Sequence, residues 1–214
     1  MQFGLRAVLS LLAAIVAAFA LLTPVASAAP APELPGPVTA VLDRLAAGNP
    51  LDAADRAVLV SYPEVAAQVL DPDRATVEST GPQVADTTEA PVVAGGGPHA
   101  LGAGCWTWDY KVYGYTVLGF VAYVFHHEVH WCTNGSTVLG MHYRNAWPSE
   151  LDGNMYWRGL VGNSATPTPN WEAQSFMQGA IENCVLKYGC IRTNYPWSRI
   201  YLYGNGDTSV GWGH

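Results

Sequence analysis

The sequence has little positive charge and no basic stripe. Its 214 residues hold 10 lysines and arginines against 17 aspartates and glutamates, for a formal net charge of −7. Proteins that bind nucleic acid cluster lysine and arginine on one face or along one segment, so the composition argues against nucleic acid as a partner. The acidic excess lies in residues 29–104, with three basic and ten acidic side chains, whereas residues 105–214 have six and seven.

Cysteine and tryptophan are absent from the first 104 residues. All four cysteines, all eight tryptophans and ten of the eleven tyrosines come later. From residue 105 onward, short runs rich in Val, Ile, Tyr, Trp and Thr are separated by glycine and proline, which is typical of an all-β sandwich or barrel. Residues 105–214 are therefore predicted to form an antiparallel β-sandwich of six to seven strands. The expected strands lie near residues 105–113, 119–132, 136–144, 153–161, 172–184, 197–204 and 208–212.

Apolar runs that approach the length of a membrane span are lacking after residue 28. Before that point, Met1–Arg6 carries one positive charge, residues 8–22 are almost continuously apolar, and Ala26-Ser27-Ala28 is a small-residue cleavage site. This order predicts a secretory signal peptide over residues 1–28 and an extracellular mature protein without a membrane span. The alternative is an uncleaved membrane anchor, for which the apolar run is short.

The region between the signal peptide and Cys105 has only a weak apolar pattern. Residues 29–70 are predicted to be an acidic helical leader, with one helix from Val38, a second capped by Asp52 and a third that begins at Pro63. A segment of this size cannot form a stable core alone, so it must dock elsewhere or stay loosely ordered. Residues 71–104 have the composition of a flexible linker. The leader is interpreted as a flexible spacer, with a propeptide or a stalk as the alternatives.

The cysteine spacings lack the short pairs of a zinc site. Successive cysteines are 27, 52 and 6 positions apart, whereas a four-cysteine zinc site needs paired ligands at short spacing. An even number of cysteines in an exported chain predicts two disulfides. The local pairing, Cys105 with Cys132 and Cys184 with Cys190, is the first choice. A Cys132–Cys184 bridge between two sheets is the alternative.

The first predicted hairpin can be aligned residue by residue. If residues 105–113 pair antiparallel with residues 120–132 around a turn at Leu118-Gly119, Cys105 lies opposite Cys132. The two-residue period of a strand then separates a core face from a solvated face. The predicted core face carries Trp106, Trp108, Tyr110 and Val112 opposite Trp131, Val129, His127 and Phe125. The solvated face carries Thr107, Asp109 and Lys111 opposite His130, Glu128 and His126.

Three short patterns occur together in the C-terminal region. They are a Trp-Cys-x-x-Gly turn in HWCTNGS, and a Cys-x5-Cys loop followed by a Tyr-Pro-Trp…Gly-Asn-Gly ending in IENCVLKYGCIRTNYPWSRIYLYGNG. The combination resembles a group of small secreted actinobacterial proteins that have no characterised activity. The resemblance covers roughly residues 105–206. It implies a secreted, disulfide-bonded β domain and supplies no catalytic residues.

Four side chains on the predicted solvated face are candidate metal ligands. Two imidazoles and two carboxylates on one face could hold Zn²⁺ or another divalent transition metal. They are Asp109, His126, Glu128 and His130. The alternative, which we favour, is a hydrated face with a Lys111–Glu128 ion pair and no cofactor. The helix motif of zinc proteases fails because Trp131 takes the place of its second histidine.

Motifs of a catalytic centre are also lacking. The serines of the C-terminal region are scattered, and none lies in a G-x-S-x-G elbow. The four cysteines are expected to be oxidised and therefore not nucleophilic. No catalytic residue is predicted. The scattered serines include Ser136, Ser149, Ser164, Ser175 and Ser198.

Tryptophans near proline, glycine or asparagine are the candidate ligand-binding residues. They are Trp147, Trp157, Trp171 and Trp212. Exposed indoles can stack on the apolar faces of sugar rings, and the alternative is that these four pack in the core. The leading hypothesis is a secreted, non-catalytic binding module for a glycan or cell-envelope polymer, with no oligomeric state assigned. The alternatives are a secreted metal-dependent hydrolase with a propeptide, and an extracellular protein-interaction or inhibitor domain.

Overall fold

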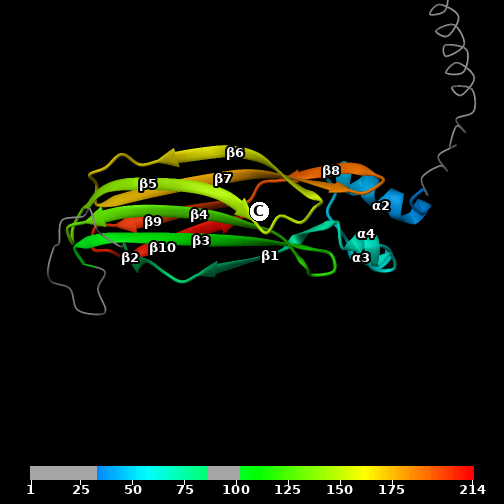
Figure 1. The fold of residues 1–214 in the computed structure, drawn as a ribbon, viewed down its shortest axis with the longest axis horizontal. Helices are drawn as coiled ribbons and strands as arrows, with labels where there is room; N and C mark the ends of the chain where they lie inside the picture. Colours follow the sequence, from blue (N-terminus) through cyan, green and yellow to red (C-terminus); the bar gives the residue numbers. More distant parts are fainter. Residues whose placement is uncertain (1–32, 86–101) are drawn as a thin grey trace, which may run out of the picture. The chain divides into compact units, whose positions relative to one another are not determined.

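The computed structural model describes residues 33–85 and 102–214 (Figure 1). The predicted signal peptide, residues 1–28, lies outside the described residues, as do residues 86–101. Three helices come first: α2 (Gly36–Ala46), α3 (Ala53–Val60) and α4 (Pro63–Ala66). They confirm the expected three-helix pattern, although α4 is a single turn. Within the described ranges, no helix is long and apolar enough to cross a membrane.

Ten strands in the described residues form two antiparallel sheets of five strands each. The first sheet has the order β1–β3–β4–β5, with β2 paired to β3; the second has the order β10–β9–β7–β6, with β8 paired to β7. This architecture confirms the predicted all-β sandwich and has more strands than the six or seven expected. The strands are β1 (Leu70–Ser79), β2 (Gln83–Val84), β3 (Gly104–Thr116), β4 (Val121–Thr133), β5 (Val138–Ser149), β6 (Met155–Ala165), β7 (Glu172–Val185), β8 (Gly189–Asn194), β9 (Trp197–Tyr203) and β10 (Thr208–Gly213).

The β3–β4 hairpin has the register expected from its sequence. Cys105 pairs with Cys132 and Asp109 with Glu128, and burial alternates along β3 from Trp108 onward. A slip of one residue would have moved every side chain to the opposite face. Both predicted disulfides, Cys105–Cys132 and Cys184–Cys190, are present, and no cysteine of the described residues is free.

The two sheets share one apolar core. The buried faces supply Trp108, Val112, Phe125, Val129 and Trp131 from the first sheet and Met177, Ile181, Ile200 and Leu202 from the second. The packing is close at Gly114, where a Cβ atom would lie 2.3 Å from the ring of Tyr123. Only glycine at this position leaves room for the buried tyrosine ring, because protein cores have no spare volume of that size.

A polar group is buried between the sheets at His127. This side chain is 0% exposed, and its Nδ1 and Nε2 atoms lie 2.7 Å from the hydroxyl oxygens of Ser198 and Ser175. The Nε atom of Arg144 also donates to Ser175 Oγ, at 2.8 Å. Burial, and secondarily the charge of Arg144, lower the pKa of His127 to about 3. The imidazole is therefore neutral at pH 7 and satisfied by two serines from the opposite sheet.

The helical leader packs on the β7–β8 hairpin, and α2 lies beside β8 (Figure 1). Tyr188 in the hairpin turn donates to Asp43 of α2 at 2.6 Å. A second apolar cluster joins the helices to the hairpin. Its buried members are Val38, Val41, Leu42, Leu45, Leu51, Leu59, Val65, Ala66 and Val69 of the leader with Val185 and Ile191 of the hairpin. The leader thus completes a core that it could not form alone.

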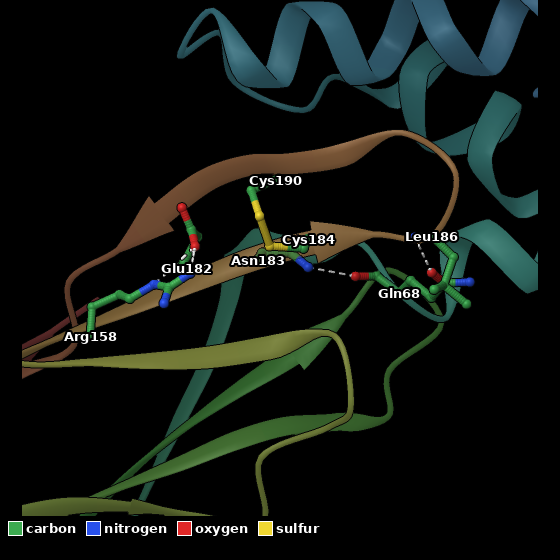
Figure 2. Close-up of a disulfide and its surroundings, with 7 residues drawn as sticks. All are labelled: Gln68, Arg158, Glu182, Asn183, Cys184, Leu186 and Cys190. Atoms are coloured by element: carbon green, nitrogen blue, oxygen red, sulfur yellow. Dashed lines mark hydrogen bonds and ion pairs between the residues drawn. A yellow bond between two sulfur atoms is a disulfide. The ribbon is translucent and has the colours of Figure 1, made fainter.

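Asn183 links the leader to the second sheet next to the Cys184–Cys190 disulfide (Figure 2). Its side chain is fully buried, donates to the backbone oxygen of Gln68 at 2.7 Å and accepts from the backbone nitrogen of Leu70 at 2.9 Å. The side chain of Gln68 in turn accepts from the backbone nitrogen of Leu186 at 2.8 Å. These bonds satisfy buried backbone groups where the chain passes from α4 into β1.

The prediction of a flexible linker over residues 71–104 is wrong for its first part. Residues 70–79 form β1 and residues 83–84 form β2, and both pair with β3. Most of β1 is exposed, so it lacks the apolar alternation by which a strand is found in sequence. Leu70 at its start is buried in the core, and the rest of the strand is held by backbone pairing with β3 and by polar bonds, including Trp108 Nε1 to Ser79 Oγ at 2.7 Å and Tyr113 to Glu78 at 2.7 Å.

Candidate functional site

The outer face of the second sheet carries an aromatic groove, defined here by Phe176, Gln178, Trp197, Arg199, Tyr201 and Gly211. On β7 and β9, alternate residues such as Ser175, Met177 and Ile200 fill the core, so the intervening residues point outward. The register places Phe176 beside Arg199 and Gln178 beside Trp197. The resulting hollow has a volume of about 300 Å³.

Two aromatic rings of the groove, those of Phe176 and Trp197, lie against each other. The ring centres of Phe176 and Trp197 are 6.1 Å apart, with an interplanar angle of 43°. The guanidinium carbon of Arg199 lies 5.1 Å from the Phe176 ring centre, within cation–π distance. Apolar ring faces therefore lie next to a guanidinium group and the amide of Gln178.

Glycines on the neighbouring strands make room for the rings of Trp197 and Phe176. A Cβ atom at Gly213 of β10 would lie 2.5 Å from Trp197 Nε1, and one at Gly162 of β6 would lie 2.7 Å from the Phe176 ring. The rings can lean over these strands only because side chains are missing there. Glycine on both sides thus keeps the indole and phenyl faces close to the sheet.

A more polar hollow of about 210 Å³ adjoins the groove and shares Phe176 and Arg199 with it. Its other lining residues are Ser164, Ala165, Thr166 and Gln174. Arg199 is exposed, and no carboxylate of the described residues lies within ion-pair distance of it. An unpaired guanidinium between two hollows can bind an anionic or hydroxyl-bearing ligand with a planar, bidentate contact.

The four tryptophans singled out from the sequence do not share one surface. Trp171 is 55% exposed and lies edge-on to Tyr203, outside the groove. Trp212 is 38% exposed and pairs with Ser198, a core-facing position, so it points away from the groove. Trp157 is partly buried against Phe125 of the core, and Trp147 lies on the first sheet, stacked on His126.

Sequence reasoning missed Trp197, the tryptophan that lines the groove. The signal was available in the alternation of β9, which puts Trp197, Arg199 and Tyr201 on the face opposite Ile200 and Leu202. That alternation does not reveal the groove, because Phe176 and Gln178, which complete the surface, come from a strand about 20 residues away in sequence.

The outer face of the first sheet carries a hydrogen-bonded chain of three residues. His126 Nδ1 lies 2.8 Å and 3.1 Å from the two carboxylate oxygens of Asp109, and His126 Nε2 lies 2.7 Å from Ser149 Oγ. Trp147 stacks on the imidazole with ring centres 4.9 Å apart and an interplanar angle of 7°. The predicted solvated face is therefore an ordered polar network.

The four candidate metal ligands form two separate pairs. Asp109 bonds to His126, and Glu128 bonds to His130 at 2.8 Å. Both ring nitrogens of His126 already have partners, so a metal would have to displace one of them. The alternative Lys111–Glu128 ion pair is also not formed, since Lys111 lies 3.3 Å from Glu78.

One group of metal-ligating residue types does converge among the described residues, at Glu182, Cys184 and Cys190. The two cysteines form a disulfide, and Glu182 is paired with Arg158 (Figure 2). A disulfide has no thiolate to offer, so this group is not suited to a metal ion.

No family model, curated protein or solved structure matches this chain. Its function is therefore inferred from the chemistry of its two outer faces.

Proposed function

We propose that this protein is a secreted module that binds an extracellular glycan or cell-envelope polymer through the aromatic groove. The observation that carries the proposal is the groove itself: Phe176, Trp197 and Tyr201 on one face of a rigid sheet, bordered by Gln178 and Arg199. Sugar rings have apolar C–H faces that stack on indole and phenyl rings, and hydroxyl groups that bond to amides and guanidinium groups.

The form of the groove suits a polymer better than a small enclosed ligand. The hollow is an open depression on the sheet, and it continues past Arg199 into the second hollow beside Gln174. Side chains on strands are held more precisely than side chains on loops, so the spacing of these groups is set before binding. Such preorganisation reduces the entropic cost of binding.

The two disulfides fit an oxidising compartment such as the extracellular space. The signal-peptide pattern of residues 1–28 supports secretion. Both observations agree with a ligand that is found outside the cell.

The test is binding of the mature protein to insoluble polysaccharides and peptidoglycan by co-sedimentation, and to soluble oligosaccharides on an array. Trp197→Ala is expected to weaken binding at least tenfold, because it removes the largest stacking surface of the groove. The matched control is Trp212→Ala, which removes an exposed indole of the same sheet that points away from the groove. Absence of binding by the wild-type protein to every polymer, or equal losses in the two variants, would overturn the proposal.

A further inference from the structure

Asp109, His126 and Ser149 come from three neighbouring strands, β3, β4 and β5, and form one hydrogen-bonded chain. A carboxylate can only accept, so the proton of the neutral imidazole lies on Nδ1 and points to Asp109. The Nε2 atom then accepts from the hydroxyl of Ser149. Nucleophile, base and orienting acid are connected in this same order in serine hydrolases, on unrelated folds.

The backbone after Ser149 is unusual. Glu150 has a φ of 51°, in the left-handed region that non-glycine residues seldom adopt. Backbone strain of this kind is concentrated at functional sites, because the surrounding structure must hold it in place. The turn ends β5 at Ser149 and leaves the serine partly exposed.

A second histidine, His127, is also hydrogen-bonded to serine side chains and provides an internal comparison. His127 contacts Ser175 and Ser198 at the same distances, but all three side chains are 0% exposed and no carboxylate contacts the ring. At the outer group, by contrast, the side chains of Asp109 and His126 are 34% and 12% exposed. Only the outer group combines an orienting carboxylate with access for a substrate.

We propose that Ser149 is a nucleophile, with His126 as its general base and Asp109 as the positioning residue, and that this site hydrolyses carboxylic esters. Ser149 Oγ attacks the acyl carbon while its proton passes to His126 Nε2. The C–O bond to the alcohol breaks, and the alcohol leaves with that proton. Water then attacks the acyl carbon and gives one proton to His126 Nε2. The bond between the acyl carbon and Ser149 Oγ breaks, Oγ takes that proton back from His126, and the carboxylic acid is released.

The surroundings of Ser149 favour an ester on a larger molecule. The site lies on an open sheet face beside the flat indole of Trp147, so a small acyl group can reach the serine while its carrier lies on the surface. An alcohol leaving group needs only the proton that His126 holds, whereas an amine leaving group demands more stabilisation. The inference does not depend on the aromatic groove, which lies on the other sheet.

The first experiment treats the full mature chain with a fluorophosphonate probe and locates the adduct by peptide mass spectrometry. We expect an adduct at Ser149 and none at Ser175 or Ser198. Ser149→Ala is expected to abolish labelling, and Ser136→Ala, which removes an exposed serine elsewhere, is expected to retain it. Two results would overturn the proposal: folded wild-type protein that forms no adduct at Ser149, or an adduct that forms in His126→Gln as fast as in the wild type.

The second experiment measures hydrolysis of p-nitrophenyl acetate and tests Asp109. Asp109→Asn is expected to lower kcat by about 100-fold and to leave KM within about twofold, since it disturbs the tautomer of His126 and not substrate binding. Asp109→Glu is expected to restore part of kcat. Equal kcat values for Asp109→Asn and the wild type, with near-ultraviolet circular dichroism unchanged, would refute the assignment. Ser136→Ala should keep the wild-type kcat, and glycan co-sedimentation is a separate measurement, so failure here and failure of glycan binding are distinguishable.

Discussion

Burial of His127 makes the stability of the sandwich depend on pH in a direction that follows from its contacts. The native pKa is about 3, against 6.5 for a solvated imidazole. Between these two values the unfolded chain binds a proton that the native state does not. The free energy of unfolding therefore falls as the pH is lowered from about 6.5 toward 3, by up to about 1.4 kcal/mol per pH unit.

The size of the effect is large compared with the stability of a typical domain. Integrated from pH 7 to pH 4, the single titration of His127 removes about 3 kcal/mol, against a usual total of about 5–15 kcal/mol. Other groups also titrate over this range, so the contribution of His127 is obtained by difference. His127→Gln keeps a neutral side chain that can donate and accept, and it has no proton to gain in acid.

The assay is urea unfolding followed by tryptophan fluorescence at pH 7, 6, 5 and 4, with the disulfides intact. At pH 7 the variant is expected to be less stable by about 1–3 kcal/mol, because Ser175 and Ser198 lose part of their hydrogen bonding. Between pH 7 and pH 4 the wild type should lose about 3 kcal/mol more stability than the variant. The deficit of the variant should therefore shrink or change sign. Parallel stability curves for the two proteins would refute the reasoning. His142→Gln removes an exposed imidazole and should follow the wild-type curve.

Four further perturbations test the fold and the groove. Gly204→Ala places a Cβ atom 2.1 Å from the backbone oxygen of Ser136 and should destabilise the domain by about 1–3 kcal/mol in a thermal melt. Asn183→Ala leaves two buried backbone groups unsatisfied and should speed hydrogen exchange of the leader helices. A chain that begins at Leu70 exposes the apolar surface of the β7–β8 hairpin and should bind the dye ANS and associate in solution. Arg199→Gln should weaken binding to acidic polysaccharides more than to neutral ones, as measured by co-sedimentation.

Matched variants separate these effects from general damage. Gly153→Ala meets no atom within 4 Å and should keep the wild-type melting temperature. Asn163→Ala removes an exposed amide and should leave leader exchange unchanged. A monomeric truncated chain that binds no ANS would contradict a structural role for the leader. Equal losses of acidic and neutral polymers on Arg199→Gln would contradict an electrostatic role for that side chain.

Local patterns were sufficient for the β3–β4 hairpin and both disulfides. Alternation of apolar and polar residues over a tight turn allows only one register that buries the apolar face, and that register sets Cys105 against Cys132. The Cys184–Cys190 pair closes a short hairpin, so it too could be predicted from the sequence. β1 could not be predicted from the sequence, because most of its residues are exposed and have no apolar period that would indicate a strand.

The sequence by itself determined the three helices, most of the strands and the face that each side chain of those strands takes, because these depend on the period of a few neighbouring residues. The exceptions are β1, β2 and β8. Only the tertiary structure decided which strands became neighbours. Ser149 meets His126 across 23 residues, and Ser198 meets His127 across 71. The aromatic groove likewise exists only where β7 and β9 lie side by side. The physical reason is that strand order is selected by the packing of the whole core, while the patterns readable in sequence are local.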